Sequence, residues 1–435
     1  MTSHLPGFLR RTLRSSEEDE SPPDVEETPE RQINDSELPE DSGASTAKAP
    51  APESATPFNS LAEFSIEDDH HNNKPPTTSE SDSPSNPQPT APAPPKTYRE
   101  SQFEKAFAAT VVNMEELRKL SWNGIPPHYR PLTWKILLGY APTHSARRPT
   151  SIQRKRQEYH QAVAQHYDIP DDNTRTAQEQ ETLRQVLVDV PRTAPEVPLF
   201  RNERIRRALA RLLYIWAMRH PASSYVQGIN DLTTPLVAVF LSEYYDGQNV
   251  LDGHVMNQLT DQQLADVEAD VYGCLANLLA GIQDHYTSDQ PGVQRMVMRL
   301  EELVNRIDSD LCQHLANTGI EFIQFAFKWM NCLLLREFEL PCVIRLWDTY
   351  ISEKESGFEG FHVYVCAAFL CQFSGQLQAM SFDELFTFMQ EMPTSDWGDT
   401  EIEMLLSQAY VLSTLFKGSD AHLLSSAKAT GNQIL

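Results

Sequence analysis

The sequence predicts an all-α fold built of many short helices. Apolar residues recur at intervals of three and four, which places them on one face of a helix, and the alternating runs typical of β-strands are nearly absent. A proline-rich and Ser/Thr-rich segment ends abruptly at Thr97, where the helical spacing begins. No internal repeat is apparent, so a solenoid of fixed period is not expected.

The N-terminal part of the chain differs in composition from the rest. Residues 1–96 contain 16 of the 30 prolines and none of the 6 tryptophans or 6 cysteines, with 19 Asp and Glu against 7 Lys and Arg. Such a segment has too little apolar surface to offset the entropy lost on ordering. We predict a disordered acidic tail over 1–98, a helical domain over 99–417 and a disordered tail over 418–435. The length of the middle part suits one large domain or two tightly joined small ones.

The helices of the domain can be followed in order. Asn113 and Glu116 have the spacing of a capping box, with Leu117 and Leu120 on one face and Gly124 able to end that helix. A helix over Arg204–Arg219 has an apolar stripe of Ile205, Leu209, Leu212, Leu213 and Trp216. A further stripe consists of Leu300, Leu303, Val304, Ile307 and Leu311, ahead of the apolar stretch Phe322–Leu335. A polar insertion is expected over Tyr244–Asp266.

Composition and motifs exclude several classes of function. A net charge of −25 argues against a nucleic-acid partner, because phosphates are bound by clustered Lys and Arg. The cysteines show no CxxC pairing, and the chain shows no secretory leader, which indicates reduced core thiols in the cytoplasm. The longest apolar runs, such as Leu236–Leu241, are too short to span a membrane. The sequence has no metal-ligand spacing, no GxSxG elbow and no phosphate-binding loop, so no cofactor is expected.

Five sets of residues are difficult to explain as generic helix. In the first, Val186–Thr193, Pro191 disfavours a helix and leaves Arg192 on a constrained loop. The others are Tyr225–Asp231, Gly124 and Ile125 with Arg130 and Trp134, Phe325–Trp329 with Arg336–Phe338, and Arg345–Tyr350.

Each of these features has a simpler reading. Arg192 alone would more often be a solvated loop arginine or an ion-pair partner. Arg345 and Asp348 have the spacing of an i, i+3 helix pair, and Trp134, Trp329 and Trp347 are interpreted as core anchors. Arginines at 201, 204, 206, 207 and 211 are interpreted as a solvated helix face, with contact to an acidic partner as the alternative.

Together these segments resemble the TBC domain, the helical module of Rab GTPase-activating proteins. The family's IxxDxxR motif matches Val186, Asp189 and Arg192, with Val in place of the usual Ile, and its YxQ motif matches Tyr225 and Gln227. Its RxxxW and RLWD segments match Arg130 with Trp134 and Arg345–Asp348. The order and spacing agree over about 124–353.

Two further segments resemble a narrower branch of that family. Val267–Asp270 and Gly281–Tyr286, the latter followed by Gln290–Gly292, are similar to Golgi-associated TBC proteins. These are the yeast Ypt-directed activator and the animal TBC family twenty-two type. The resemblance implies a domain of two subdomains and a peripheral location at the Golgi, where such proteins regulate vesicle trafficking.

The resemblance also implies roles for individual residues. Arg192 would be an arginine finger and Gln227 a glutamine finger, both inserted into the active site of a GTP-bound Rab GTPase. Asp189 would hold the Arg192 loop, Tyr225 would aim Gln227, and Arg130 would support activity. The protein would then be an activator and not itself an enzyme, because GTP and magnesium belong to the partner.

Two other classes of function remain open. One is a Rab-binding scaffold that acts without catalysis, although the presence of both Arg192 and Gln227 argues against it. The other is an adaptor that binds partners through the N-terminal tail. There, Arg11 and Arg14 precede Ser15 and Ser16 in a pattern that fits a kinase or phospho-reader, and Phe58, Leu61 and Phe64 could form a partner-binding helix.

Overall fold

The computed structural model describes residues 97–169, 174–245, 249–287, 289–354 and 357–416, and over these residues the chain is helical. Extended pairing within this part is limited to a single bridge between Val111 and His144. The all-α prediction is therefore confirmed. Of the tails predicted over 1–98 and 418–435, residues 1–96 and 418–435 lie outside the described residues. The described part shows the first helix starting at Tyr98 with Thr97 as its cap, so the predicted boundary after residue 98 is slightly late. None of the described helices is long and apolar enough to cross a membrane.

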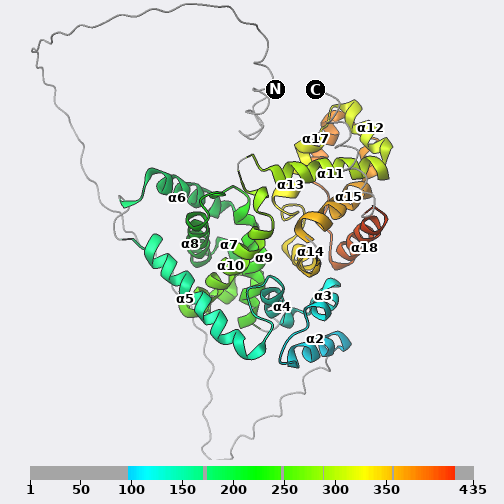
Figure 1. Cartoon of the computed structure of the whole chain (residues 1–435). Coiled ribbons are helices and arrows are strands. Elements are labelled where there is room, and N and C mark those ends of the chain that lie inside the picture. The colour runs from blue at the N-terminus through cyan, green and yellow to red at the C-terminus, as the bar shows by residue number, and fades with distance from the viewer. Residues whose placement is uncertain (1–96, 170–173, 246–248, 288, 355–356, 417–435) are drawn as a thin grey trace, which may run out of the picture. The chain divides into compact units, whose positions relative to one another are not determined.

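The α-helices follow one another along the chain (Figure 1). They are α2 (Tyr98–Ala108), α3 (Met114–Trp122), α4 (Arg130–Leu137), α5 (Arg148–His166), α6 (Ala177–Asp189), α7 (Pro198–Arg201), α8 (Glu203–Arg219), α9 (Ile229–Leu241), α10 (Asp261–Gly281), α11 (Pro291–Ile307), α12 (Ser309–Thr318), α13 (Phe322–Asn331), α14 (Leu340–Ser352), α15 (His362–Gln372), α16 (Ser374–Leu377), α17 (Phe382–Gln390) and α18 (Asp399–Phe416). Short 3₁₀ turns and one π-helical turn (Gly357–Phe361) lie between them.

Local sequence signals explain where many of these helices begin. Thr97, Thr176 and Thr260 each accept a hydrogen bond from the third residue of the helix they precede, and that residue returns the bond. Such a capping box satisfies backbone N–H groups that have no partner inside the helix. Asn113 caps α3 as predicted by accepting from the backbone N–H groups of Glu115 and Glu116, but the described structure has no return bond from the Glu116 side chain. Gly124 follows the end of α3 with a φ of +88°.

The described helices pack as two groups. Helices α5, α6, α8, α9 and α10 contact one another, as do α11, α12, α13, α15 and α18. Helix α14 contacts both groups, because it packs against α9, α4 and α3 on one side and α18 on the other. Figure 1 shows α14 at this central position.

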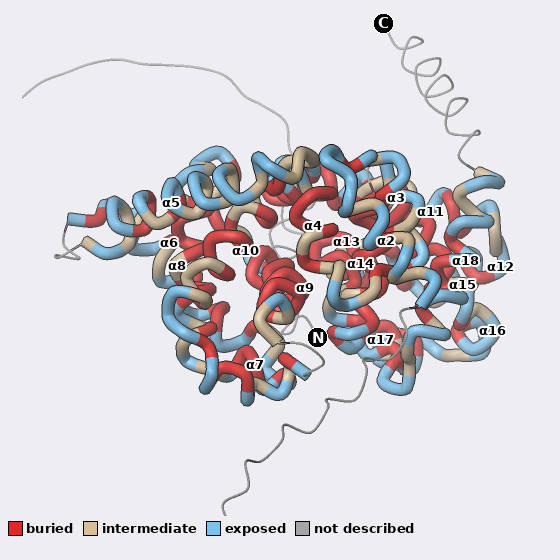
Figure 2. The backbone as a smooth tube through the Cα atoms, turned by 90° about the horizontal axis from the view of Figure 1, so that it is seen from below, coloured by how far each residue is buried: buried red, intermediate tan, exposed pale blue. Residues whose placement is uncertain are grey.

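Helix α9 is the most deeply buried element of the domain. All 13 of its residues are buried (Figure 2), the polar Asn230 and Asp231 in its first turn as well as the apolar residues that follow. Pro235 has no backbone N–H to donate to the carbonyl of Asp231, four residues earlier. This carbonyl accepts instead from the Thr234 hydroxyl at 2.8 Å. The first turn of α9 carries the segment after Gln227, so a rigid core supports the candidate site.

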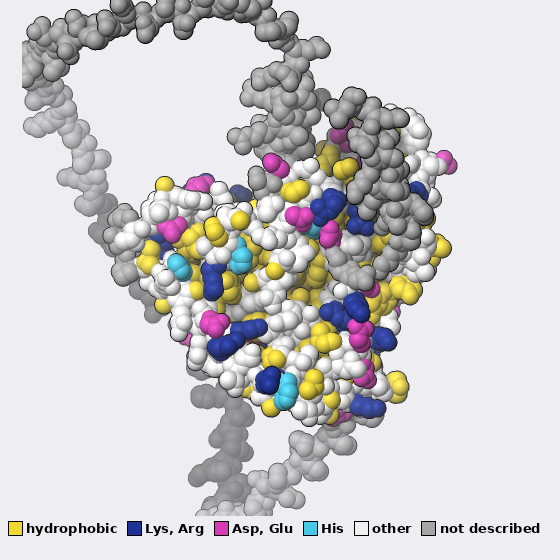
Figure 3. All heavy atoms as spheres, viewed as in Figure 1, with side chains coloured by type: hydrophobic (Ala, Val, Ile, Leu, Met, Phe, Trp, Pro, Cys, Tyr) yellow, Lys and Arg dark blue, Asp and Glu magenta, His cyan; other side chains and the backbone are white. Residues whose placement is uncertain are grey.

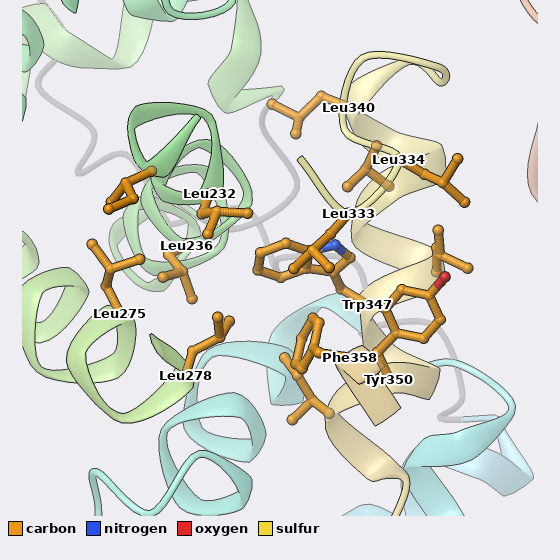
Figure 4. Packing of buried hydrophobic residues seen from close by; sticks show 14 of the residues in the cluster. Leu232, Leu236, Leu275, Leu278, Leu333, Leu334, Leu340, Trp347, Tyr350 and Phe358 are labelled. Atoms are coloured by element: carbon orange, nitrogen blue, oxygen red, sulfur yellow. The ribbon is translucent and has the colours of Figure 1, made fainter. Parts of the chain in front are cut away.

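The core around α9 contains the large side chains that the sequence assigned to it. Leu232 and Leu236 of α9 lie beside Leu275 and Leu278 of α10, and Trp347 of α14 lies nearby (Figure 4). The side chains of Trp134, Trp329 and Trp347 are fully buried, which confirms their reading as core anchors. All six cysteines are free and at least half-buried.

Two predictions about helices are wrong. Leu311 does not continue the stripe of Leu300 to Ile307, because the chain turns at Asp308 and begins α12. The Asp308 carboxylate caps this new helix by accepting from the backbone N–H of Leu311 at 3.0 Å. Arg345 and Asp348 do not pair with each other: Arg345 donates to Thr349 at 3.0 Å, and Asp348 faces Arg130.

The reading of the arginine row on α8 as a solvated face is also wrong in part. Arg204 donates to the carbonyls of Met256 and Leu259 at 2.7 and 2.9 Å, and Arg211 forms a two-bond ion pair with the buried Glu268 of α10. Arg201 and Arg207 are exposed as predicted, and Arg207 forms an i, i+4 pair with Glu203. Helix α10 packs over this side of α8, which the spacing of α8 alone does not show.

Candidate functional site

Arg192 stands on a single 3₁₀ turn (Val190–Arg192) directly after α6. The turn is anchored on both sides, since the side chain of Val190 is 3% exposed and that of Thr193 is 1% exposed. The Thr193 hydroxyl donates to the carbonyl of Asp189 at 3.2 Å, and Ala194 then takes a left-handed φ of +40°. Arg192 itself is exposed, and its guanidinium makes no hydrogen bond or ion pair with the part of the chain that the structure describes.

Gln227 stands in the connection between α8 and α9. Tyr225, two residues earlier, is buried, whereas Gln227 is exposed. Gly228 follows with a φ of +109° and precedes the first residue of α9. Only glycine adopts this backbone conformation without strain. The side chain of Gln227 is therefore presented to solvent from a backbone that is fixed on both sides.

A buried polar network joins the two segments. Its centre is Asn230, whose side chain is 2% exposed. The Asn230 Oδ1 accepts from the N–H of Gly228 at 3.0 Å, and its Nδ2 donates to the Thr193 hydroxyl at 3.0 Å. Gly228 follows Gln227 and Thr193 follows Arg192, so one side chain fixes the immediate neighbours of both candidate fingers.

Tyr225 and Asp189 belong to the same network. The Tyr225 hydroxyl donates to Asp189 Oδ2 at 3.0 Å and lies 3.3 Å from Asn230 Oδ1. Burial and the nearby Asp189 carboxylate raise the pKa of Tyr225, so its hydroxyl stays protonated and able to donate. The contact connects the end of α6 with the segment that carries Gln227.

A second arginine lies at the edge of this network. Arg336 donates to Asp231 Oδ2 from Nε at 2.8 Å and from its terminal nitrogen at 2.7 Å. Burial raises the pKa of Asp231, and the Arg336 pair partly offsets that rise. Arg192, Asp231 and Arg336 line one hollow of about 420 Å³, together with residues from 335–340 and from the segment between α17 and α18.

Arg130 lies in a different set of contacts. Its Nε is 3.1 Å from both oxygens of Asp348, and Asp348 also accepts from the indole N–H of Trp134 at 2.7 Å and from the backbone N–H of Ile125 at 2.8 Å. Asp348 is fully buried, and its burial raises its pKa while Arg130 lowers it. The pair joins α4 to α14, so the contacts of Arg130 are those of a residue that stabilises the fold.

The structure brings four of the five candidate residues together. Asp189 and Tyr225 hold the backbone beside Arg192 and Gln227, whereas within the described part of the chain Arg130 forms no hydrogen bond or ion pair with this network. Asn230, Thr193 and Asn331 are network members that the sequence did not single out. Asn331 did leave a signal, because it is a polar residue within the apolar stretch Phe322–Leu335. Among the described residues, no group of three or more His, Cys, Asp or Glu could hold a metal ion.

On the face that Figure 3 displays, Lys and Arg side chains are interspersed with Asp and Glu among the coloured residues. This mixture suits a contact that depends on individual side chains and their geometry.

Comparison with known proteins gives one family and several relatives. Residues 127–378 match the model of the Rab-GTPase-TBC domain. The chain is 46% identical over 323 residues to the GTPase-activating protein gyp1 of Schizosaccharomyces pombe, covering 74% of this chain and 62% of that protein. It is also 46% identical over 335 residues to human TBC1 domain family member 22B, covering 76% of this chain and 65% of that protein.

A solved structure gives the same result. The crystal structure of the Ypt/Rab-GAP domain of Gyp1p superposes with a TM-score of 0.70 at 46% identity, covering 73% of this chain and 98% of that one. The matches with the two curated relatives span less than two thirds of the length of those proteins. The similarity is thus concentrated in the helical domain that carries Arg192 and Gln227.

Proposed function

Since the chain belongs to the TBC-domain family of Rab GTPase-activating proteins, in the branch of Gyp1 and TBC1 domain family members 22A and 22B, we propose that it accelerates GTP hydrolysis by a Rab-family GTPase. The partner would bind in its GTP-bound state and would contribute both the nucleotide and the magnesium ion. The observation that supports the proposal is the polar network around Asn230, which fixes Thr193 and Gly228, the residues that directly follow the exposed Arg192 and Gln227.

Arg192 would supply positive charge to the reaction. Hydrolysis of GTP passes through a loose transition state whose charge lies on phosphoryl oxygens, and an arginine inserted in trans accelerates it by about 10³ to 10⁵. This corresponds to about 4 to 7 kcal/mol of barrier lowering. Because the Arg192 guanidinium has no carboxylate partner among the described residues, its full charge and all of its donors are available to the partner's nucleotide.

Gln227 would orient the attacking water. Its carboxamide can accept a hydrogen bond from the water and donate one to the transferring phosphoryl group at the same time, which an ionised side chain cannot do. Its backbone is held by the contacts of Gly228 and Tyr225, so a correct position does not depend on the partner alone. Both groups complete another protein's active site.

Single-turnover GTP hydrolysis tests the proposal. The full chain is added to each member of a panel of GTP-loaded Rab GTPases, and the rate is compared for wild type, Arg192→Ala, Arg192→Lys and Gln227→Ala. Lysine keeps the charge but not the planar fork, so we expect all three variants to lose most of the acceleration. Arg184→Ala and Gln408→Ala, which change exposed residues elsewhere, are matched controls. Unchanged rates in the three site variants would leave a non-catalytic, Rab-binding scaffold as the better description.

From the similarity to this branch alone, we also propose that the chain is cytoplasmic, lies peripherally at the Golgi membrane and regulates vesicle trafficking. Imaging of the full chain with a Golgi marker tests the location. Imaging of a variant that lacks residues 1–98 tests whether the N-terminal tail determines this location by binding an adaptor or a phospho-reader.

A further inference from the structure

We propose that Asn331 and Gln290 are positioning residues for Gln227, with Gln290 fixing the orientation of the Asn331 amide and Asn331 holding the backbone of the glutamine finger. The inference rests on the proposed function of Gln227. It extends that function to two residues that come from α13 and from the start of α11, in the other helix group from the fingers themselves.

The first step concerns the peptide unit between Gln227 and Gly228. Its carbonyl accepts from Asn331 Nδ2 at 3.2 Å, and its N–H donates to Asn230 Oδ1 at 3.0 Å. The two asparagines are both buried, and each holds one end of the same flat unit. A peptide plane held at both ends cannot rotate, and the direction in which the Gln227 side chain leaves the backbone is thereby fixed.

The contact between Asn331 and this peptide is close. A Cβ atom placed on Gly228 would lie 2.4 Å from Asn331 Nδ2. Gly228 is therefore required for two reasons, its φ of +109° and the presence of the Asn331 amide against it. Asn331 is the last residue of α13, and its own carbonyl accepts from the buried Tyr286 hydroxyl at 2.8 Å, which fixes its backbone.

The second step concerns which way the Asn331 amide faces. Gln290 Nε2 donates to the carbonyl of His285 at 2.7 Å and to Asn331 Oδ1 at 2.8 Å. The His285 carbonyl can only accept, so the Gln290 side chain must direct its NH₂ group to this side. Asn331 must then turn its oxygen to Gln290 and its NH₂ group to the Gln227 carbonyl. Two backbone carbonyls thus determine the orientation of both side-chain amides.

The backbone around Gln290 is held in an uncommon conformation. Asp289 and Gln290 have φ values of +62° and +46°, in the left-handed region that non-glycine residues rarely adopt. Such conformations cost free energy and persist where the surrounding structure enforces them, often at functional sites. Here they place Gln290 between His285 and Asn331, ahead of Pro291 at the start of α11. The segments Gly281–Tyr286 and Gln290–Gly292, which resemble the branch in sequence, thereby contact the finger backbone through Asn331.

Asn331→Asp tests the proposal with a change of one atom. The variant keeps the acceptor toward Gln290 and replaces the donor toward Gln227 by an oxygen that repels the carbonyl. We use the Rab that the wild-type chain accelerates most and measure separately the maximal single-turnover rate and the half-saturating concentration of activator. A misplacement of a catalytic group by about 1 Å can cost on the order of a hundredfold in rate. We expect the maximal rate to fall by about ten- to a hundredfold, with a smaller change in half-saturation.

A double-mutant cycle separates positioning from general damage to the fold. If Asn331 acts through Gln227, adding Asn331→Asp to Gln227→Ala should cause little further loss of rate. Gln290→Glu, at a half-buried position, gives a second variant that removes the donor to Asn331 without changing Asn331 or Gln227. Asn317→Asp, at an exposed position, controls for the added charge.

The outcomes are distinguishable. A maximal rate within about twofold of wild type in both Asn331→Asp and Gln290→Glu would overturn the inference while leaving the proposed function intact. The inference would also be overturned if Asn331→Asp lowered the maximal rate by the same factor in the wild-type chain and in Gln227→Ala. If the wild-type chain accelerates no Rab in the panel, the proposed function fails and this inference fails with it.

Discussion

At the scale of single residues, the site combines an exposed arginine side chain with neighbouring residues that are held by hydrogen bonds. The guanidinium of Arg192 has no partner within the described residues, whereas its neighbour Thr193 both donates to Asp189 and accepts from Asn230. A buried polar group normally needs such partners, because leaving one unpaired costs about 1 to 3 kcal/mol. The network therefore stabilises the fold and places the exposed side chains with the same set of bonds.

Tyr225→Phe should weaken both the fold and the site. It removes the hydroxyl that donates to the carboxylate of Asp189, a residue that is 8% exposed, and leaves that carboxylate without this bond. We expect the free energy of unfolding to fall by about 1 to 3 kcal/mol, measured by urea denaturation, and the maximal rate of GTP hydrolysis to fall as well. Tyr410→Phe, at a side chain that is 54% exposed, is the control. Equal stability and rate in Tyr225→Phe would show that the hydroxyl does not hold these segments.

The sequence could name Arg192, Gln227 and the supporting pair Asp189 and Tyr225, but not the asparagines that complete the network. The finger residues belong to short motifs whose order along the chain is readable. Asn230 and Asn331 act across distances of 37 and 104 residues, to Thr193 and Gln227, and such pairings depend on how helices pack. Asn331 was detectable only as a polar residue in an apolar stretch, which says that it has a partner but not which one.

At the scale of helices, capping residues and apolar periodicity predict where the helices lie along the chain, whereas the packing of the helices determines which polar side chains pair. The stripe of α8 was read correctly, but Arg211 on its other side is paired with Glu268 because α10 covers it. In the same way Asp348, three residues after Arg345, turned out to face α4. The sequence of a single helix shows which of its faces is apolar, but only the folded structure shows which neighbouring helix contacts its polar face.

Arg130→Ala should destabilise the junction between α4 and α14. Removing one partner of a buried ion pair typically costs about 3 to 5 kcal/mol, because the other charge stays buried without compensation. Arg130 is 19% exposed at its side chain, and Asp348 keeps its bonds from Trp134 and Ile125, so we expect a loss near about 3 kcal/mol. The measurement is urea denaturation of the full chain. Arg154→Ala, whose pair with Glu158 is exposed, should change stability by less than about 1 kcal/mol.

If Arg130→Ala unfolds with the same free energy as wild type, a structural role is excluded. The expectation from the family resemblance, that Arg130 supports activity directly, would then be the better account of any rate that it loses.

At the scale of the whole domain, acid should reduce stability through buried histidines. His362 is fully buried, and burial lowers its pKa to about 3 from the usual 6.5. Its Nε2 lies 3.1 Å from the carbonyl of Trp329, which can only accept, and its Nδ1 lies 2.8 Å from the Tyr350 hydroxyl. The neutral ring therefore donates at one nitrogen and accepts at the other. Burial lowers the pKa of His285 in the same direction.

The sign of the effect follows from proton binding. Between pH 6.5 and pH 3 the unfolded His362 binds a proton that the folded one does not, so stability is present above about pH 6.5 and falls as pH falls. We expect a loss of about 2 kcal/mol from this group between about pH 6.5 and pH 5, measured by denaturation at each pH. In His362→Gln, which keeps a donor and an acceptor without titrating, the loss should be smaller. An equal slope in that variant would rule out His362 as a source.

The peptide unit between Gln227 and Gly228 has a consequence for how long a complex must last. Ordering a flexible residue costs about 1 to 2 kcal/mol of conformational entropy. Because Asn230 and Asn331 already hold this unit in the free chain, that cost is met when the domain folds and not at each encounter with a GTPase. In the proposed reaction, binding of the GTPase therefore does not have to order this unit, so a short-lived contact loses less free energy to ordering.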